Sequence, residues 1–164
     1  MILDTTYLLP LVGIDVETDL FNAIEHRSVD LDLSSVSISL ISIYEIQAKC
    51  AKFGISWEIV NEALNELLNR FEIIPFYNNN IMKTSFMIRQ EIPHYIDCII
   101  LSTAICKEDS LMTEDRRILS FMERNGGKFK INARPLNHYP CWRCNQLPFQ
   151  MWTVYMTRGN GNLW

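Results

Sequence analysis

The sequence predicts an α/β fold of three layers, in which a central, mostly parallel sheet of four to five strands is flanked by helices. Short apolar runs rich in β-branched residues alternate with segments of helical period along residues 1–136. At 164 residues, with 48% hydrophobic and 21% charged residues, the chain has the balance of a single domain that buries a substantial core. Strands that alternate with helices favour an open parallel sheet covered on both faces.

Five short runs are predicted to be strands. The first, residues 1–3, ends on Asp4 and continues through two threonines into the apolar residues 7–9, which we interpret as a strand with a carboxylate at its C-terminal end. The other runs are apolar or β-branched and are bounded by turn-forming residues. They are residues 36–40, 71–75, 110–112 and 129–133.

Six segments are predicted to be helices. The clearest is 56–68, whose apolar residues recur at the spacing of one helix face. The segment 95–106 is apolar on nearly every side, so we expect it to be deeply buried. Gly126 and Gly127 are expected to end the last helix. The predicted helices are residues 19–26, 42–51, 56–68, 81–91, 95–106 and 116–124.

We expect one domain over residues 1–136 and an atypical extension over residues 137–164. The extension contains no acidic residue and three of the four tryptophans, and only residues 152–156 could pair as a strand. Cys141 and Cys144 form a single C-x-x-C that would lack a fourth zinc ligand even with His138, so zinc is the weaker interpretation. The role of the extension stays open.

Charge and cysteine content exclude several classes of protein. A net charge of −4 is not typical of a general polyanion binder, so a nucleic-acid enzyme of this composition would need bound cations at its acidic site. The five cysteines are an odd number without secretory context, which indicates reduced thiols. No basic leader and no run near the ~20 apolar residues of a membrane span are found. We therefore expect a cytoplasmic protein without membrane association.

Four carboxylates are expected to meet at one edge of the sheet. Asp4 ends the first strand and Asp115 follows the fourth, and ligands of parallel sheets bind outside the carboxyl ends of the strands. Glu45 lies in the helix after the second strand, and Asp97 lies in the first turn of the apolar helix. Such a cluster is tolerable chiefly around hard divalent cations, so we expect Mg²⁺ or Mn²⁺.

Each of these residues also has a simpler interpretation. Asp4 could simply end a strand or cap a helix, and Glu45 could be solvated. Asp97 could stabilise a helix dipole, and Thr113 with Asp115 could cap the following helix. Glu114 is expected to point away into solvent. The joint occurrence of the four acids favours a site.

Other catalytic arrangements find little support. The three histidines are not arranged with a serine or cysteine as a triad, and no glycine-rich phosphate loop is present.

Four blocks of the sequence together resemble the PIN-domain family, in the family's order and at its usual spacing. The blocks are Ile2-Leu3-Asp4-Thr5-Thr6, Ser42-Ile43-Tyr44-Glu45, residues 97–104, and Leu111 to Arg117. The resemblance covers about residues 1–136. Within the family, the sequence is similar to the VapC-like toxins of type II toxin-antitoxin systems. The resemblance implies that Asp4, Glu45, Asp97 and Asp115 are catalytic and bind the metal ion. It also implies that Thr113, and often Thr5 or Thr6, supports this cluster. From their place beside the acidic residues, we expect Thr5, Arg116 and Arg117 to contact the substrate.

The resemblance also implies a function. It predicts a metal-dependent endoribonuclease that cleaves RNA phosphodiester bonds, leaves 5′-phosphate ends, forms a homodimer and is inhibited by an antitoxin protein. A housekeeping RNA-processing nuclease and a PIN-like RNA- or protein-binding module without catalysis stay open as alternatives. A third alternative, phosphoryl transfer on a small molecule with Asp4 as nucleophile, is weakened because position 6 is threonine and not a second aspartate.

Overall fold

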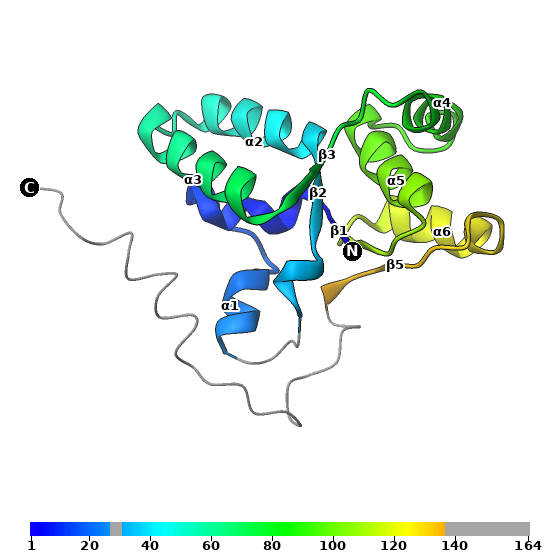
Figure 1. The fold of residues 1–164 in the computed structure, drawn as a ribbon, viewed down its shortest axis with the longest axis horizontal. Helices are drawn as coiled ribbons and strands as arrows, with labels where there is room; N and C mark the ends of the chain where they lie inside the picture. The colour runs from blue at the N-terminus through cyan, green and yellow to red at the C-terminus, as the bar shows by residue number, and fades with distance from the viewer. Residues whose placement is uncertain (27–30, 137–164) are drawn as a thin grey trace, which may run out of the picture.

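The computed structural model describes residues 1–26 and 31–136 (Figure 1). The predicted extension 137–164, with its cysteine pair and candidate strand, lies outside the described residues. None of the described helices combines the length and the hydropathy needed to cross a bilayer.

Five parallel strands form one sheet, which confirms the predicted fold class. The strands are β1 (Ile2–Leu3), β2 (Ser37–Ser39), β3 (Glu72–Ile74), β4 (Leu111–Met112) and β5 (Ala133–Arg134). Their order is β3-β2-β1-β4-β5, and every neighbouring pair is parallel. The chain therefore builds one half of the sheet outward from β1 and then returns to build the other half. This order places the topological switch point between β1 and β4, where ligands of open α/β sheets bind.

The strands alternate their side chains between two cores, which makes three layers. Leu3 and Met112 belong to the core that packs under η1, α1, α2 and α3, while Ile2 and Leu111 belong to the core under α4, α5 and α6. Figure 1 shows α2 and α3 on one side of the strands and α4, α5 and α6 on the other. The helices are η1 (Thr5–Val12), α1 (Leu20–Glu25), η2 (Leu33–Ser35), α2 (Leu40–Phe53), α3 (Trp57–Arg70), α4 (Asn79–Ile88), α5 (Tyr95–Lys107) and α6 (Arg116–Phe129).

The helix α5 confirms the expectation of deep burial, because residues 98–104 are all buried. Its contacts join the sheet to α4 and α6. The carboxylate in its first turn, Asp97, is thereby fixed at the edge of the core.

The first strand ends before Asp4, as the sequence predicted. Residues 7–9, to which the sequence assigned no element of their own, belong to the 3-10 helix η1. The strand β1 is central in the sheet, and Pro10 has no backbone N–H to donate to a neighbouring strand. Instead Tyr7 and Leu8 are fully buried in the core, and the backbone N–H of Tyr7 donates to the carbonyl oxygen of Asp4 at 3.2 Å.

The last helix differs from the prediction. Gly126 and Gly127 do not end α6, which continues to Phe129. The ring of Phe129 stacks on that of Phe121 at 5.8 Å, and the Asn125 side-chain amide donates to the Phe121 carbonyl. These contacts outweigh the low helix propensity of glycine. The last strand consequently begins at Ala133, later than predicted.

Candidate active site

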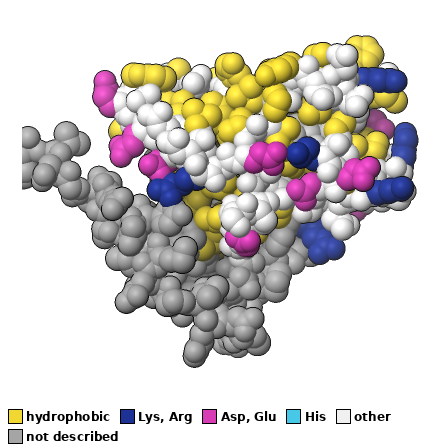
Figure 2. Space-filling view, viewed as in Figure 1, with side chains coloured by type: hydrophobic (Ala, Val, Ile, Leu, Met, Phe, Trp, Pro, Cys, Tyr) yellow, Lys and Arg dark blue, Asp and Glu magenta, His cyan; other side chains and the backbone are white. Residues whose placement is uncertain are grey.

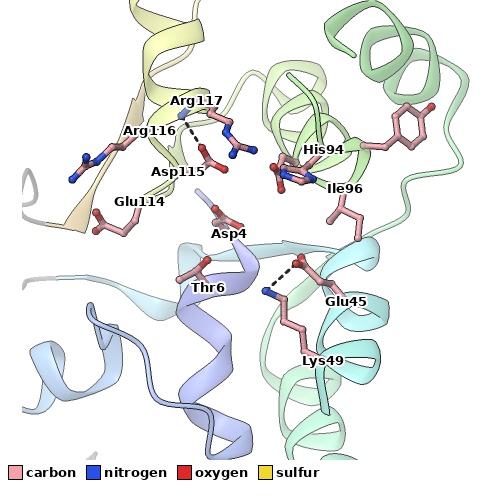
Figure 3. Close-up of a pocket in the computed structure, with 12 residues that line it drawn as sticks. Asp4, Thr6, Glu45, Lys49, His94, Ile96, Glu114, Asp115, Arg116 and Arg117 are labelled. Atoms are coloured by element: carbon pink, nitrogen blue, oxygen red, sulfur yellow. Dashed lines mark hydrogen bonds and ion pairs between the residues drawn. The ribbon is translucent and has the colours of Figure 1, made fainter. Parts of the chain in front are cut away.

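A cavity of about 800 Å³ opens at the carboxyl ends of β1 and β4 (Figure 3). We call it the carboxylate pocket because acidic side chains from four separate segments line it. Its acidic residues are Asp4, Glu45, Asp97, Glu114 and Asp115, and its basic residues are Lys49, Arg116 and Arg117, with His94, Tyr95, Ile96 and Thr6 completing the wall.

Asp4 and Thr113 connect the ends of the two central strands. The Asp4 side chain is 7% exposed, and Thr113 is fully buried beneath it. The Thr113 hydroxyl donates to Asp4 Oδ2 at 2.5 Å and accepts a hydrogen bond from the backbone N–H of Asp115 at 3.1 Å. One hydroxyl group therefore orients both the first carboxylate and the loop that carries another.

Asp115 caps the helix α6. Its Oδ1 accepts a hydrogen bond from the backbone N–H of Arg117 at 2.7 Å, and its carbonyl oxygen accepts one from Leu119 at 3.0 Å. Figure 3 shows its carboxylate lying between Arg117 and Asp4. The capping interpretation from the sequence is thus confirmed, and the same side chain also lines the pocket.

Glu45 and Asp97 form the opposite wall. Glu45 lies one turn inside α2, where Lys49 of the next turn approaches its Oε1 at 3.2 Å. Asp97 lies in the first turn of α5. These two carboxylates come from helices on opposite faces of the sheet and meet above its edge.

The acidic side chains influence one another's ionisation. Burial raises the pKa of Asp4 to about 6, and the charges of Asp97 and Glu45 add to this rise, against the opposing Thr113 hydrogen bond. Burial likewise raises the pKa of Asp97 to about 6, with further contributions from Asp115 and Glu45. Five carboxylates and three lysine or arginine side chains line the pocket, so its acidic groups outnumber its basic ones.

The model of the PIN-domain family matches residues 1–123 of the sequence. The chain belongs to the PIN-domain family. PIN domains are generally nucleases and usually use divalent metal ions. No curated protein matches the sequence of this PIN domain.

Solved structures share the fold of this PIN domain. A toxin-antitoxin complex from Klebsiella pneumoniae is 24% identical with a TM-score of 0.52, and the match covers 79% of this chain and 93% of that one. VapBC2 from Rickettsia felis, bound to a DNA fragment from its promoter, is 20% identical with a TM-score of 0.55 and coverages of 82% and 96%. FitAcB from Neisseria gonorrhoeae is 18% identical with a TM-score of 0.58 and coverages of 84% and 98%.

The PIN domain places most of the predicted site residues around one cavity. Asp4, Glu45, Asp97 and Asp115 line the carboxylate pocket together with Arg116 and Arg117, and Thr113 lies beneath them.

Thr5 lies outside the pocket wall. Its side chain is 1% exposed, and its hydroxyl has no hydrogen-bond partner among the described residues. Because the chain turns into η1 directly after Asp4, Thr6 lines the pocket instead. The Thr5 side chain is therefore too buried to make the predicted contact with a substrate.

Glu114 is not the solvated residue that we expected. Its Oε1 accepts hydrogen bonds from the Tyr7 hydroxyl at 2.7 Å and from the backbone N–H of Leu136 at 3.0 Å. Sequence reasoning missed Tyr7, although a tyrosine in an otherwise aliphatic run was a usable signal. A buried tyrosine hydroxyl normally requires a polar partner.

The residues of the pocket fit a magnesium or manganese ion. Among residues 1–26 and 31–136, no three carboxylate, histidine or cysteine side chains lie close enough together to make a ready-formed metal site. Mg²⁺, however, usually takes one or two carboxylates and keeps several waters. The donors of the pocket are carboxylate oxygens, their charges are mutually repulsive, and Thr113 orients the most buried of them.

Proposed function

We propose that the protein is a Mg²⁺- or Mn²⁺-dependent endoribonuclease that acts as the toxin of a toxin-antitoxin pair. One observation carries the proposal: five carboxylates from four segments of the chain line one pocket at the switch point of the sheet. Burial, and to a smaller extent neighbouring carboxylates, raise the pKa of Asp4 and of Asp97, and a bound cation would favour the charged form of both, which supports the proposal.

The carboxylates of the pocket would hold the ion, one or two of them as direct ligands and the others through its waters. The candidates are Asp4, Asp97, Asp115 and, from α2, Glu45. When bound, such an ion lowers the pKa of a water and stabilises the negative charge on the leaving oxygen in phosphodiester hydrolysis. Thr113 keeps the Asp4 carboxylate turned toward the pocket, and the α6 cap keeps Asp115 beside it. We expect RNA products with 5′-phosphate and 3′-hydroxyl ends.

The basic residues of the pocket would bind the RNA backbone. Arg116 and Arg117 follow the acidic cluster at the start of α6, and Lys49 approaches it from α2. These cations flank the carboxylates, so phosphates on either side of the cleaved bond can be neutralised while the bond itself lies over the acids. Single-stranded or looped RNA suits such a site because its backbone bends readily into a pocket. We also propose that the protein acts in the cytoplasm.

We further propose a homodimer and an antitoxin partner. Three of the solved structures similar in fold are named as a toxin-antitoxin complex, VapBC2 and FitAcB. Hydrophobic side chains gather over α2, α3 and α4 in Figure 2. On α4, Met82, Phe86 and Met87 are exposed by 43%, 70% and 56%. Exposed apolar patches of this kind mark interaction surfaces, and we assign the α4 face to a second copy of the chain.

Cleavage of a labelled RNA panel tests the proposed activity. We expect cutting with Mn²⁺ or Mg²⁺, none with EDTA, and none with Asp97→Asn, which keeps the shape of the side chain but removes its charge. If the wild-type protein bound RNA but did not cut it, we would conclude that the protein is a binding module and not a nuclease.

A further inference from the structure

Glu114 and Tyr7 form a second connection between the two loops that carry Asp4 and Asp115. Tyr7 lies three residues after Asp4, and Glu114 directly precedes Asp115. The Tyr7 hydroxyl donates to Glu114 Oε1 at 2.7 Å. Figure 3 shows the Glu114 carboxylate on the opposite side of Asp4 from Glu45. The loops are therefore joined twice, by Thr113 to Asp4 and by Tyr7 to Glu114.

A third group closes this contact into a triangle. The backbone N–H of Leu136 donates to Glu114 Oε1 at 3.0 Å and lies 3.1 Å from the Tyr7 hydroxyl oxygen. The Glu114 oxygen thus receives two donors, one from η1 and one from the chain just after β5. Hydrogen bonds to a charged carboxylate are about twice as strong as those between neutral groups.

The tyrosine is well suited to hold this position. Its ring is fully buried in the core under η1, so it has little freedom to move. Its backbone N–H donates to the carbonyl oxygen of Asp4, which ties it to the first strand end. A shift of Glu114 away from Tyr7 would leave a buried hydroxyl without its acceptor, which is unfavourable.

We propose that Tyr7 and Glu114 are a positioning pair that sets Asp115 relative to Asp4, and that Glu114 is not itself a metal ligand. This inference rests on the proposed function. Metal ligands need supporting hydrogen bonds to hold their oxygens in place, and the loss of such support typically lowers metal affinity 10–100-fold. The pair provides this support for the loop between β4 and α6.

Tyr7→Phe tests the pair, because it keeps the ring in the core and removes only the hydroxyl. We expect the Mn²⁺ affinity of the full chain, measured by isothermal titration calorimetry, to fall about 10-fold. In RNA cleavage, kcat should fall while KM stays within about twofold, because the phosphate-binding residues are untouched. Glu114→Ala, whose site is half-buried at the loop surface, should give the same loss, and the double variant should be no worse than either single one.

Glu114→Gln separates positioning from metal binding. Glutamine keeps the oxygen that accepts from Tyr7 and Leu136, so most of the Mn²⁺ affinity should be retained. If Glu114 were a ligand, Glu114→Gln would lose Mn²⁺ as strongly as Asp115→Asn, and Tyr7→Phe would bind normally; that result overturns the proposal. Unchanged affinity in both Tyr7→Phe and Glu114→Ala also overturns it while leaving the nuclease intact. Wild type that neither binds Mn²⁺ nor cuts RNA would instead overturn the proposed function itself.

Discussion

The hydroxyl of Thr113 donates a hydrogen bond to the carboxylate of Asp4 across 109 residues of sequence. The contact is possible because β1 and β4 are parallel neighbours whose carboxyl ends lie at the same edge of the sheet. The same hydroxyl accepts from the backbone N–H of Asp115. The position of both carboxylates therefore depends on one side chain.

Thr113→Val should weaken metal binding, because valine has nearly the shape of threonine without the hydroxyl. The pKa of Asp4 should rise further, since the Thr113 hydrogen bond opposes the effect of burial. We expect Mn²⁺ affinity to fall 10–100-fold in calorimetric titration. Thr113→Ser, which keeps the hydroxyl, is the matched control and should bind nearly as well as wild type. Equal Mn²⁺ affinity in the valine and serine variants would show that the Thr113 hydroxyl does not support metal binding.

Asp4→Asn should stabilise the metal-free protein at neutral pH. The pKa of Asp4 is about 6 in the folded chain against its ordinary value of 3.8, so the folded state binds more protons between these pH values. The free energy of unfolding of wild type therefore falls as pH rises through this window. Two pKa units correspond to about 3 kcal/mol, which is the upper bound of the gain expected at pH 8.

Urea unfolding in EDTA at pH 8 and near pH 3.5 measures this gain. It should be present at the higher pH and nearly absent at the lower one, and saturating Mn²⁺ should favour wild type instead. Asp15→Asn removes an exposed carboxylate and is the control, with little change expected. A wild type more stable than Asp4→Asn at pH 8 in EDTA would contradict the raised pKa of Asp4.

Lys49→Gln should have opposite effects on metal and RNA. Lys49 pairs with Glu45 at 3.2 Å and so competes with a cation for that carboxylate. We expect Mn²⁺ to bind a few-fold more tightly. RNA should bind more weakly, with the slope of log affinity against log salt reduced by about 0.7 for the lost phosphate contact. Filter binding over a salt series with Ca²⁺ or EDTA measures the slope, and an unchanged slope would exclude Lys49 from the phosphate contacts.

Phe86→Glu should convert the proposed dimer to a monomer. The side chain is 70% exposed on α4 and would place a charge in an apolar interface. Phe53→Glu is the matched control, because Phe53 is 63% exposed at the end of α2. Light scattering coupled to gel filtration measures the mass. A monomeric wild type would contradict the proposed dimer. A dimer that only Phe53→Glu disrupts would show that the dimer interface lies near Phe53 and not on α4.

The sequence predicts the sheet and the acidic side of the pocket well, for a physical reason. Parallel strands in an α/β sheet end at a common edge, so Asp4 and Asp115 could be placed near each other from strand positions alone. Burial of residues 98–104 followed from a segment without a polar face. These features depend on local patterns that survive in the folded chain.

Other features depend on packing between residues far apart and could not be predicted. The sequence of residues 7–9 has neither a clear strand pattern nor a clear helix pattern. Their 3-10 conformation depends on the burial of Tyr7 and the position of Pro10. Because of this 3-10 conformation, Thr6 and not Thr5 lines the pocket. The helix α6 continues past its two glycines because Phe129 stacks on Phe121.

A crystal soaked in Mn²⁺ and measured near the manganese absorption edge tests the central claim most directly. We expect an anomalous-scattering peak in the carboxylate pocket within bonding distance of Asp4, Asp97 or Asp115, and its loss in Asp97→Asn. A peak bound to Glu114 with none beside those three aspartates, or no peak in the pocket at saturating Mn²⁺, would contradict it.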